Sequence, residues 1–112
     1  MPLRDDQATL RQMLAHAREA LALVQGKSRA DLDRERVLAL ALLQLLQIVG
    51  EAAGRLSPAY CDMHPEIPWP QIVALRNRLI HGYDVIDLDI VWSILSTDIP
   101  SLIAELERLT CA

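Results

Sequence analysis

The sequence has no phenylalanine, only four glycines and few other aromatic residues, and each scarcity limits what the chain can be. Two tryptophans and two tyrosines are its only aromatic residues, so the hydrophobic 52% is mainly leucine, alanine, isoleucine and valine. This composition favours helices that pack on helices. The four glycines are not clustered, so no glycine-rich phosphate loop is predicted.

The length of 112 residues is enough for one hydrophobic core and too short for two. No strand pattern, internal repeat or low-complexity segment is recognisable. We therefore expect one all-α domain that covers residues 1–112 and contains four or five helices.

The longest apolar run, "VLALALLQLLQIVG", is interrupted by glutamines and is shorter than the roughly 20 residues that span a bilayer. The N-terminus is acidic and polar, whereas a signal peptide begins with basic residues followed by an apolar stretch. Cys61 and Cys111 are more typical of two thiols in a reducing compartment than of a disulfide. We expect a cytoplasmic protein without a membrane partner.

The charge is unevenly distributed along the chain. The formal net charge is −4, and from Pro58 to Ala112 there are eight acidic residues but only three basic ones, Arg76, Arg78 and Arg108. This balance argues against a broad nucleic-acid-binding surface. Two of the three arginines lie in one short polar run, "RNRLIHGYD", at residues 76–84.

Hydrophobic periodicity and capping residues predict five helices. The first covers residues 5–25 and ends at Gly26. The second begins at Asp31 or Asp33 and continues to Pro58, and a loop rich in proline follows at residues 57–70. The third begins near Trp69 or Pro70 and carries the polar run. The fourth is capped by Asp87, and the fifth is capped by Thr97 with Pro100 in its first turn.

The second predicted helix is apolar almost all the way round between Val37 and Val49. A helix in a small bundle normally exposes one polar face, so this helix requires a second surface to cover it. The simplest cover is another copy of the chain, which predicts a homodimer. The alternative is a central helix that is fully enclosed in a monomer.

The polar run permits two interpretations. If the third helix continues through it, Asn77, His81 and Asp84 form one stripe, whereas Arg76 and His81 lie about 140° apart around the axis. A bend or an end near Gly82, or a two-fold partner, would bring these two side chains together. Alternatively, the cations only stabilise a helix C-terminus through its dipole.

The chemistry of the run favours metal-free RNA cleavage. Cys61 and His64 have a ligand-like spacing, but with His81 as the only third candidate no zinc site is predicted, and no serine lies in a nucleophile turn. A histidine can transfer protons near neutral pH, and an arginine can hold a phosphate and its developing negative charge.

Three segments, "IVGEAAGRLS", "IPWPQIVALRNRLIHGY" and "VIDLDIVWSILSTDIPSL", together resemble the HepT-like toxins of the HEPN superfamily in order and spacing. The resemblance implies a HEPN-type four- to five-helix bundle that forms a homodimer, with two motifs facing each other in a composite cleft. It also implies a metal-independent endoribonuclease that acts on tRNA or mRNA without a cofactor. In the motif RNxxxHxY, Arg76 and His81 take the catalytic positions and Asn77 the supporting one.

The resemblance further implies control at Tyr83. In the family, a minimal nucleotidyltransferase antitoxin of the MntA type transfers AMP to this motif tyrosine, which would place negative charge beside Arg76. The alternative for Tyr83 is a partly buried ring with a solvated hydroxyl. Arg78 lies outside the pattern and is expected to be solvated or to make an auxiliary RNA contact. A different class of function, a non-catalytic helical dimer that binds a nucleotide or a partner protein, also fits the composition.

Overall fold

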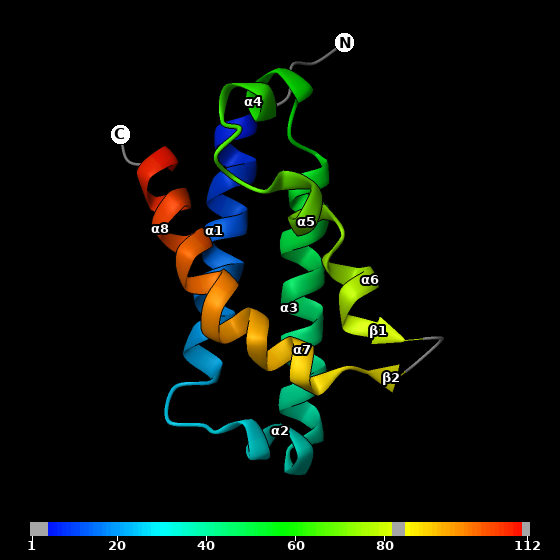
Figure 1. The fold of residues 1–112 in the computed structure, drawn as a ribbon. Coiled ribbons are helices and arrows are strands. Elements are labelled where there is room, and N and C mark those ends of the chain that lie inside the picture. Colours follow the sequence, from blue (N-terminus) through cyan, green and yellow to red (C-terminus); the bar gives the residue numbers. More distant parts are fainter. Residues whose placement is uncertain (1–4, 82–84, 111–112) are drawn as a thin grey trace.

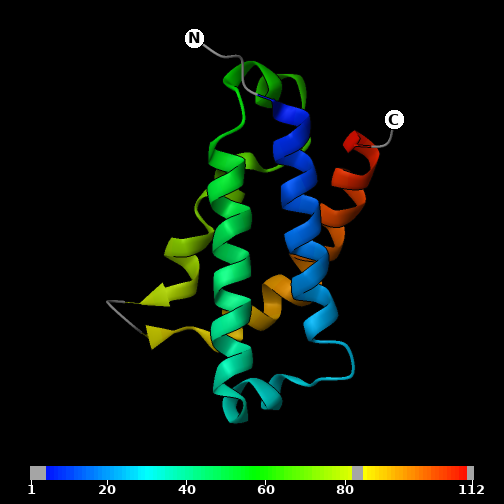
Figure 2. The ribbon, with the colours of Figure 1, turned by 180° about the vertical axis from the view of Figure 1, so that it is seen from behind.

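Two long antiparallel helices, α1 (Asp6–Leu23) and α3 (Arg36–Gly54), form the centre of the fold (Figure 1). The computed structural model describes residues 5–81 and 85–110. Helix α8 (Ile99–Thr110) packs along α1, and Figure 2 shows α1 and α3 side by side from behind. The expected all-α fold is confirmed, since the described strands are two residues long.

Helix α1 forms where its periodicity predicts it. The carboxylate of Asp5 accepts a hydrogen bond from the N–H of Ala8 at 3.0 Å and caps the first turn. The helix buries a stripe of apolar side chains at three- and four-residue spacing: Leu10, Met13, Leu14, Ala17 and Ala20. Gly26 follows with a φ of +74°, a conformation that L side chains rarely adopt, and the chain turns towards α2.

The long second helix predicted from the sequence is broken in the structure. Helix α2 (Arg29–Arg34) ends at Glu35, where φ is −113° and ψ is 83°, and α3 then begins. The predicted caps, Asp31 and Asp33, are therefore wrong. Ser28 precedes α2, and its N–H donates to the carboxylate of Asp31 at 2.7 Å, as in a capping box.

Helix α3 is the most enclosed element of the bundle. Eight of its residues are buried, and it packs against α1, α2 and three later helices: α5 (Trp69–Val73), α6 (Leu75–Leu79) and α7 (Leu88–Ser93). Towards its N-terminal end, however, Val37 is 81% exposed and Leu40 is 43% exposed, so the fully enclosed alternative is wrong at this end. By length and composition alone α3 could cross a membrane, but the core helix of a soluble protein has the same properties.

The proline-rich segment predicted as a loop contains one short helix, α4 (Pro58–Met63), and the predicted start of the next helix near Trp69 is confirmed by α5. In α4, Ser57 is the cap, since its Oγ accepts from the N–H of Tyr60 at 3.2 Å. Helix α5 (Trp69–Val73) follows. Both helices have a proline in the first turn, where the missing N–H costs nothing because that group has no helical partner.

The C-terminal third is one continuous helical path. Asp87 caps α7 (Leu88–Ser93), because its carboxylate accepts from the N–H of Ile90 at 3.0 Å, and this prediction is confirmed. A π-helix, η1 (Ile94–Asp98), then leads directly into α8. Thr97 lies inside η1, so the predicted cap at this residue is wrong. The predicted fifth helix is confirmed as α8, with Pro100 in its first turn, although it follows η1 without a break.

Candidate active site

The motif begins on α6 (Leu75–Leu79), a helix of only five residues. A break at Ala74, with φ of −84° and ψ of 7°, separates α6 from α5. Leu75 and Leu79 are buried against the core, and the three residues between them, Arg76, Asn77 and Arg78, are exposed. The two buried leucines therefore anchor α6 to the core, and the three polar side chains between them lie at the surface.

Gly50 of α3 fixes how closely α5 approaches the core. A Cβ atom at this position would lie 2.9 Å from the carbonyl oxygen of Ile72 and 3.5 Å from Cβ of Leu75. These contacts fall on α5 and on the first residue of α6. A glycine in the middle of α3 thus allows the backbone that leads into the motif to pack against this helix.

The helix ends before His81, which corrects the prediction of one helix through residue 81. Ile80 is extended, with φ of −121° and ψ of 129°, and β1 (Ile80–His81) pairs antiparallel with β2 (Val85–Ile86), with His81 opposite Val85 (Figure 1). The N–H of Asp87 donates to the carbonyl of Leu79 at 2.8 Å. The predicted helical stripe of Asn77 and His81 is therefore wrong, and the helical angle between Arg76 and His81 no longer applies.

Three of the residues singled out from the sequence, Gly82, Tyr83 and Asp84, lie outside the described residues. In the sequence they lie between β1 and β2, and Tyr83 is two residues after His81. For His81 itself, the backbone pairing is described. The roles assigned to His81 and Tyr83 remain predictions.

The two arginines of α6 have different surroundings. Nη1 and Nη2 of Arg78 both lie 3.4 Å from Oδ2 of Asp98 in η1. Arg76 has no ion-pair partner among the described residues, and the two side chains are about 160° apart around α6. No described acidic residue therefore neutralises the charge of Arg76, whereas the charge of Arg78 is partly neutralised.

Sequence analysis did not identify Asp98. Twenty residues separate it from Arg78, so no local spacing signals the pair. The only indication of a partner for Arg78 is negative charge, which Asp98 shares with seven other acidic residues between Pro58 and Ala112. Only the fold, which brings η1 within reach of the Arg78 side chain, selects it from the others.

The residues with zinc-like spacing make other contacts. The rings of His64 and Tyr60 lie 4.7 Å apart, and Nδ1 of His64 lies 3.4 Å from the carboxylate of Glu66. Cys61 is a free thiol whose pKa is raised by burial. Within the described ranges, no three His, Cys, Asp or Glu residues are grouped so that they could hold a metal ion.

A family model described as "Ribonuclease HepT-like" matches residues 13–109, a range that includes the whole motif. The chain is 33% identical to "Probable ribonuclease HepT" of Thermococcus cleftensis over 95 residues, which cover 81% of this chain and 86% of the relative. It is 30% identical over 107 residues to a "Putative RNase" of Methanocaldococcus jannaschii, with 96% and 98% of the two chains covered. No solved structure matches the chain significantly.

Proposed function

Because this chain belongs to the HepT-like family of ribonucleases, we propose that it is the toxin of a toxin–antitoxin pair. In this proposal the enzyme acts in the cytoplasm and cleaves cellular RNA, either tRNA or mRNA, at the motif that contains Arg76 and His81. It requires no metal ion or other cofactor. The observation that carries the proposal is the exposed guanidinium of Arg76, which has no ion-pair partner among the described residues.

The proposed reaction divides three tasks among the motif side chains. His81 acts as a general base and takes the proton of a ribose 2′-OH, which attacks the adjacent phosphorus. A separate general acid protonates the leaving oxygen. Arg76 binds the phosphate and stabilises the additional negative charge of the transition state. Asn77, also exposed on α6, supports the site by orienting the reacting groups.

A second copy of the chain would complete this site. Val37 and Leu40 are exposed on α3, and covering apolar side chains is the driving force for most protein association. In the proposed homodimer two motifs share a composite cleft, which contains two copies of Arg76. A cleft with two such arginines can attract RNA although the net charge of each chain is −4, because local potential rather than net charge governs binding there.

Tyr83 is the proposed point of control. A cognate nucleotidyltransferase antitoxin, similar to MntA, would transfer AMP from ATP to the Tyr83 hydroxyl and release pyrophosphate. The tyrosine is two residues from His81 along the chain. Its phosphate would neutralise the charge of Arg76 and its nucleoside would fill the cleft, so that RNA no longer binds.

The toxin assignment is tested by growth of cells that express the chain. Expression alone is expected to arrest growth, and Arg76→Ala is expected to remove the arrest. Co-expression of the cognate nucleotidyltransferase should restore growth and add the mass of AMP to the peptide that contains Tyr83. Arrest that persists with Arg76→Ala would contradict the site, whereas rescue that is equally effective with Tyr83→Phe would contradict the modification.

A further inference from the structure

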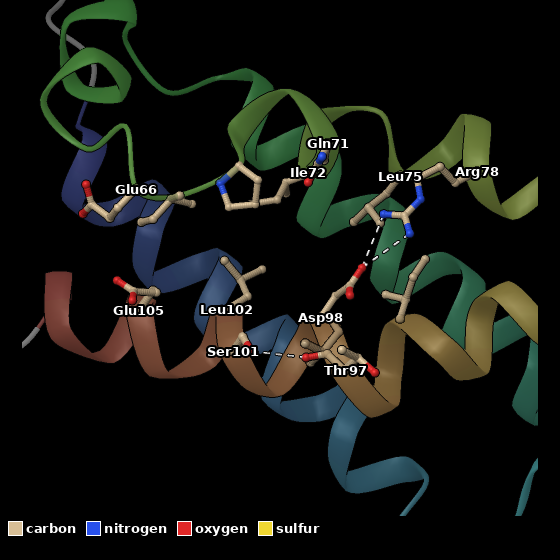
Figure 3. A pocket seen from close by; sticks show the side chains of 14 residues that line it. Glu66, Gln71, Ile72, Leu75, Arg78, Thr97, Asp98, Ser101, Leu102 and Glu105 are labelled. Carbon is tan, nitrogen blue, oxygen red and sulfur yellow. Dashed lines mark hydrogen bonds and ion pairs between the residues drawn. The ribbon is translucent and has the colours of Figure 1, made fainter.

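A groove of about 330 Å³ lies on the opposite flank of α6 from Arg76, between α5 and α6 on one side and η1 and α8 on the other (Figure 3). This volume is at the lower end of the roughly 300–1,000 Å³ found for small-molecule sites. The apolar lining comes from both walls and includes Ile72, Leu75, Ile94 and Leu102. The groove is therefore large enough for a slender molecule with an apolar body.

The two ends of the groove are acidic. Figure 3 shows Asp98 with Arg78 at one end and Glu66 with Glu105 at the other, with Leu102 between them. The lining contains three carboxylates and one guanidinium. Arg108, beside the groove, also pairs with Glu66 and Glu105, which leaves an excess of one negative charge. This excess disfavours RNA phosphates and favours a cationic ligand.

The spacing of the acidic ends determines the shape of that ligand. Asp98 and Glu105 are seven residues apart at the η1–α8 wall, which corresponds to about 10 Å at the helical rise. The wall between them is lined by the apolar side chains of Ile99 and Leu102, together with Ser101. A ligand with two cationic groups would match the two acidic ends. A hydrocarbon chain between these groups would lie on the apolar lining residues, which form the floor of the groove.

We propose that this groove binds a linear aliphatic diamine or polyamine, with one ammonium group at Asp98, another at Glu66 and Glu105, and the methylene chain on the apolar floor. The ammonium groups would each donate to carboxylate oxygens. The methylene groups would be removed from water by Ile72 and Leu102.

Arg78 competes with such a ligand for Asp98. Its two contacts are long for hydrogen bonds at 3.4 Å, and the side chains of Arg78 and Asp98 are 40% and 46% exposed. Both contacts end on Oδ2, so within the described residues Oδ1 of Asp98 accepts no hydrogen bond. An ammonium group can therefore bind Asp98 beside Arg78 or replace it.

At the other end the carboxylates are already charged and aligned. Nη2 of Arg108 donates to Glu66 at 2.8 Å and to Glu105 at 2.5 Å, which bridges the two walls. The backbone N–H of Glu66 and then Arg108 lower the pKa of the Glu66 carboxyl, so it is ionised at neutral pH. A ligand ammonium would join this bridge without having to ionise an acid.

The test is a calorimetric and NMR titration of the full chain with diaminoheptane, heptylamine and heptanediol. The three probes share one hydrocarbon chain and differ only in their charged ends. We expect saturable binding of diaminoheptane, weaker binding of heptylamine and the weakest binding of heptanediol. Equal affinity for the diol and the diamine, or no saturable binding of the diamine, would overturn the proposal.

Variants test the Asp98 end of the groove and the competition between the ligand and Arg78. Asp98→Asn should weaken diamine binding by about fivefold, as expected for the loss of one exposed ion pair. Arg78→Gln should strengthen it, because the resident cation is removed. Glu107→Gln is the charge-matched control, since Glu107 pairs with Arg18 outside the groove. Thermal unfolding of each variant confirms folding, and weaker binding by Arg78→Gln or an equal loss in Glu107→Gln would contradict the site. These readouts do not depend on RNA cleavage.

Discussion

Arg78 and Asp98 join the motif helix α6 to the π-helix η1, with both terminal nitrogens of the arginine 3.4 Å from one carboxylate oxygen. The pair lies on the side of α6 opposite Arg76. This arrangement separates the roles of two neighbouring arginines, one that binds within the protein and one that is open to solvent.

Arg78→Ala is expected to reduce RNA cleavage far less than Arg76→Ala. Asp98 already neutralises part of the charge of Arg78, whereas Arg76 has no such partner among the described residues. The loss of this exposed pair should lower the free energy of unfolding by at most about 1 kcal/mol. Initial rates on one RNA and chemical denaturation measure the two effects, and equal losses of activity in both variants would show that Arg78 also contacts RNA.

Gly50→Ala should destabilise the fold, because its Cβ would lie 2.9 Å from the carbonyl oxygen of Ile72. Overpacking of this kind costs about 1–3 kcal/mol, and the gain in helix propensity offsets at most about 1 kcal/mol. Gly54→Ala is the matched control on the same helix, since its nearest neighbour is 3.9 Å away. Denaturation should show Gly50→Ala below and Gly54→Ala at or above the wild type, and the reverse order would contradict the packing of α5 on α3.

Glu66 should make the stability of the protein depend on acid pH. Its own backbone N–H and then Arg108 lower its folded-state pKa below the ordinary value of 4.5, so the stabilisation is present above pH 4.5 and is lost as the pH falls through the folded-state pKa. Thermal unfolding between neutral pH and pH 3 measures this loss. Glu66→Gln should show a smaller decrease over the same window, and an unchanged decrease would assign it to other carboxyl groups.

The wild-type chain should sediment as a dimer at micromolar concentration. Val37 and Leu40 are exposed apolar residues of α3, so charges there should oppose association without disturbing the core. We expect the double variant Val37→Asp, Leu40→Asp to sediment as a monomer with unchanged helical content by circular dichroism. A wild-type monomer at this concentration would contradict the dimer and leave these side chains unexplained.

The parts of the fold that local chemistry determines were predictable from the sequence. The first helix and the cap at Asp87 follow from spacing within a few residues, and both are confirmed. The breaks at Glu35 and Ala74 were not predictable, because the flanking residues are compatible with continuous helix. Pro58 indicated a loop but lies in the first turn of α4, whereas Pro70 marked the start of a helix, as α5 confirms.

The candidate site was predictable in composition but not in geometry. Residue types and the family resemblance identified Arg76 and His81 without contacts from the rest of the fold. The end of α6 at Leu79 depends on the pairing of β1 with β2, which brings together residues from both sides of 82–84. The partner of Arg78 depends on η1, an element without a recognisable sequence pattern here.

The most direct test of the proposed site is cleavage of purified RNA in the presence of a metal chelator by wild type, Arg76→Ala and His81→Ala. If the proposed site is correct, the wild type cleaves equally with and without chelator. Each variant is then slower by about 100-fold or more, the effect expected for loss of a general acid–base or a charge-stabilising group. Equal cleavage by all three proteins, or wild-type activity that the chelator abolishes, would contradict it.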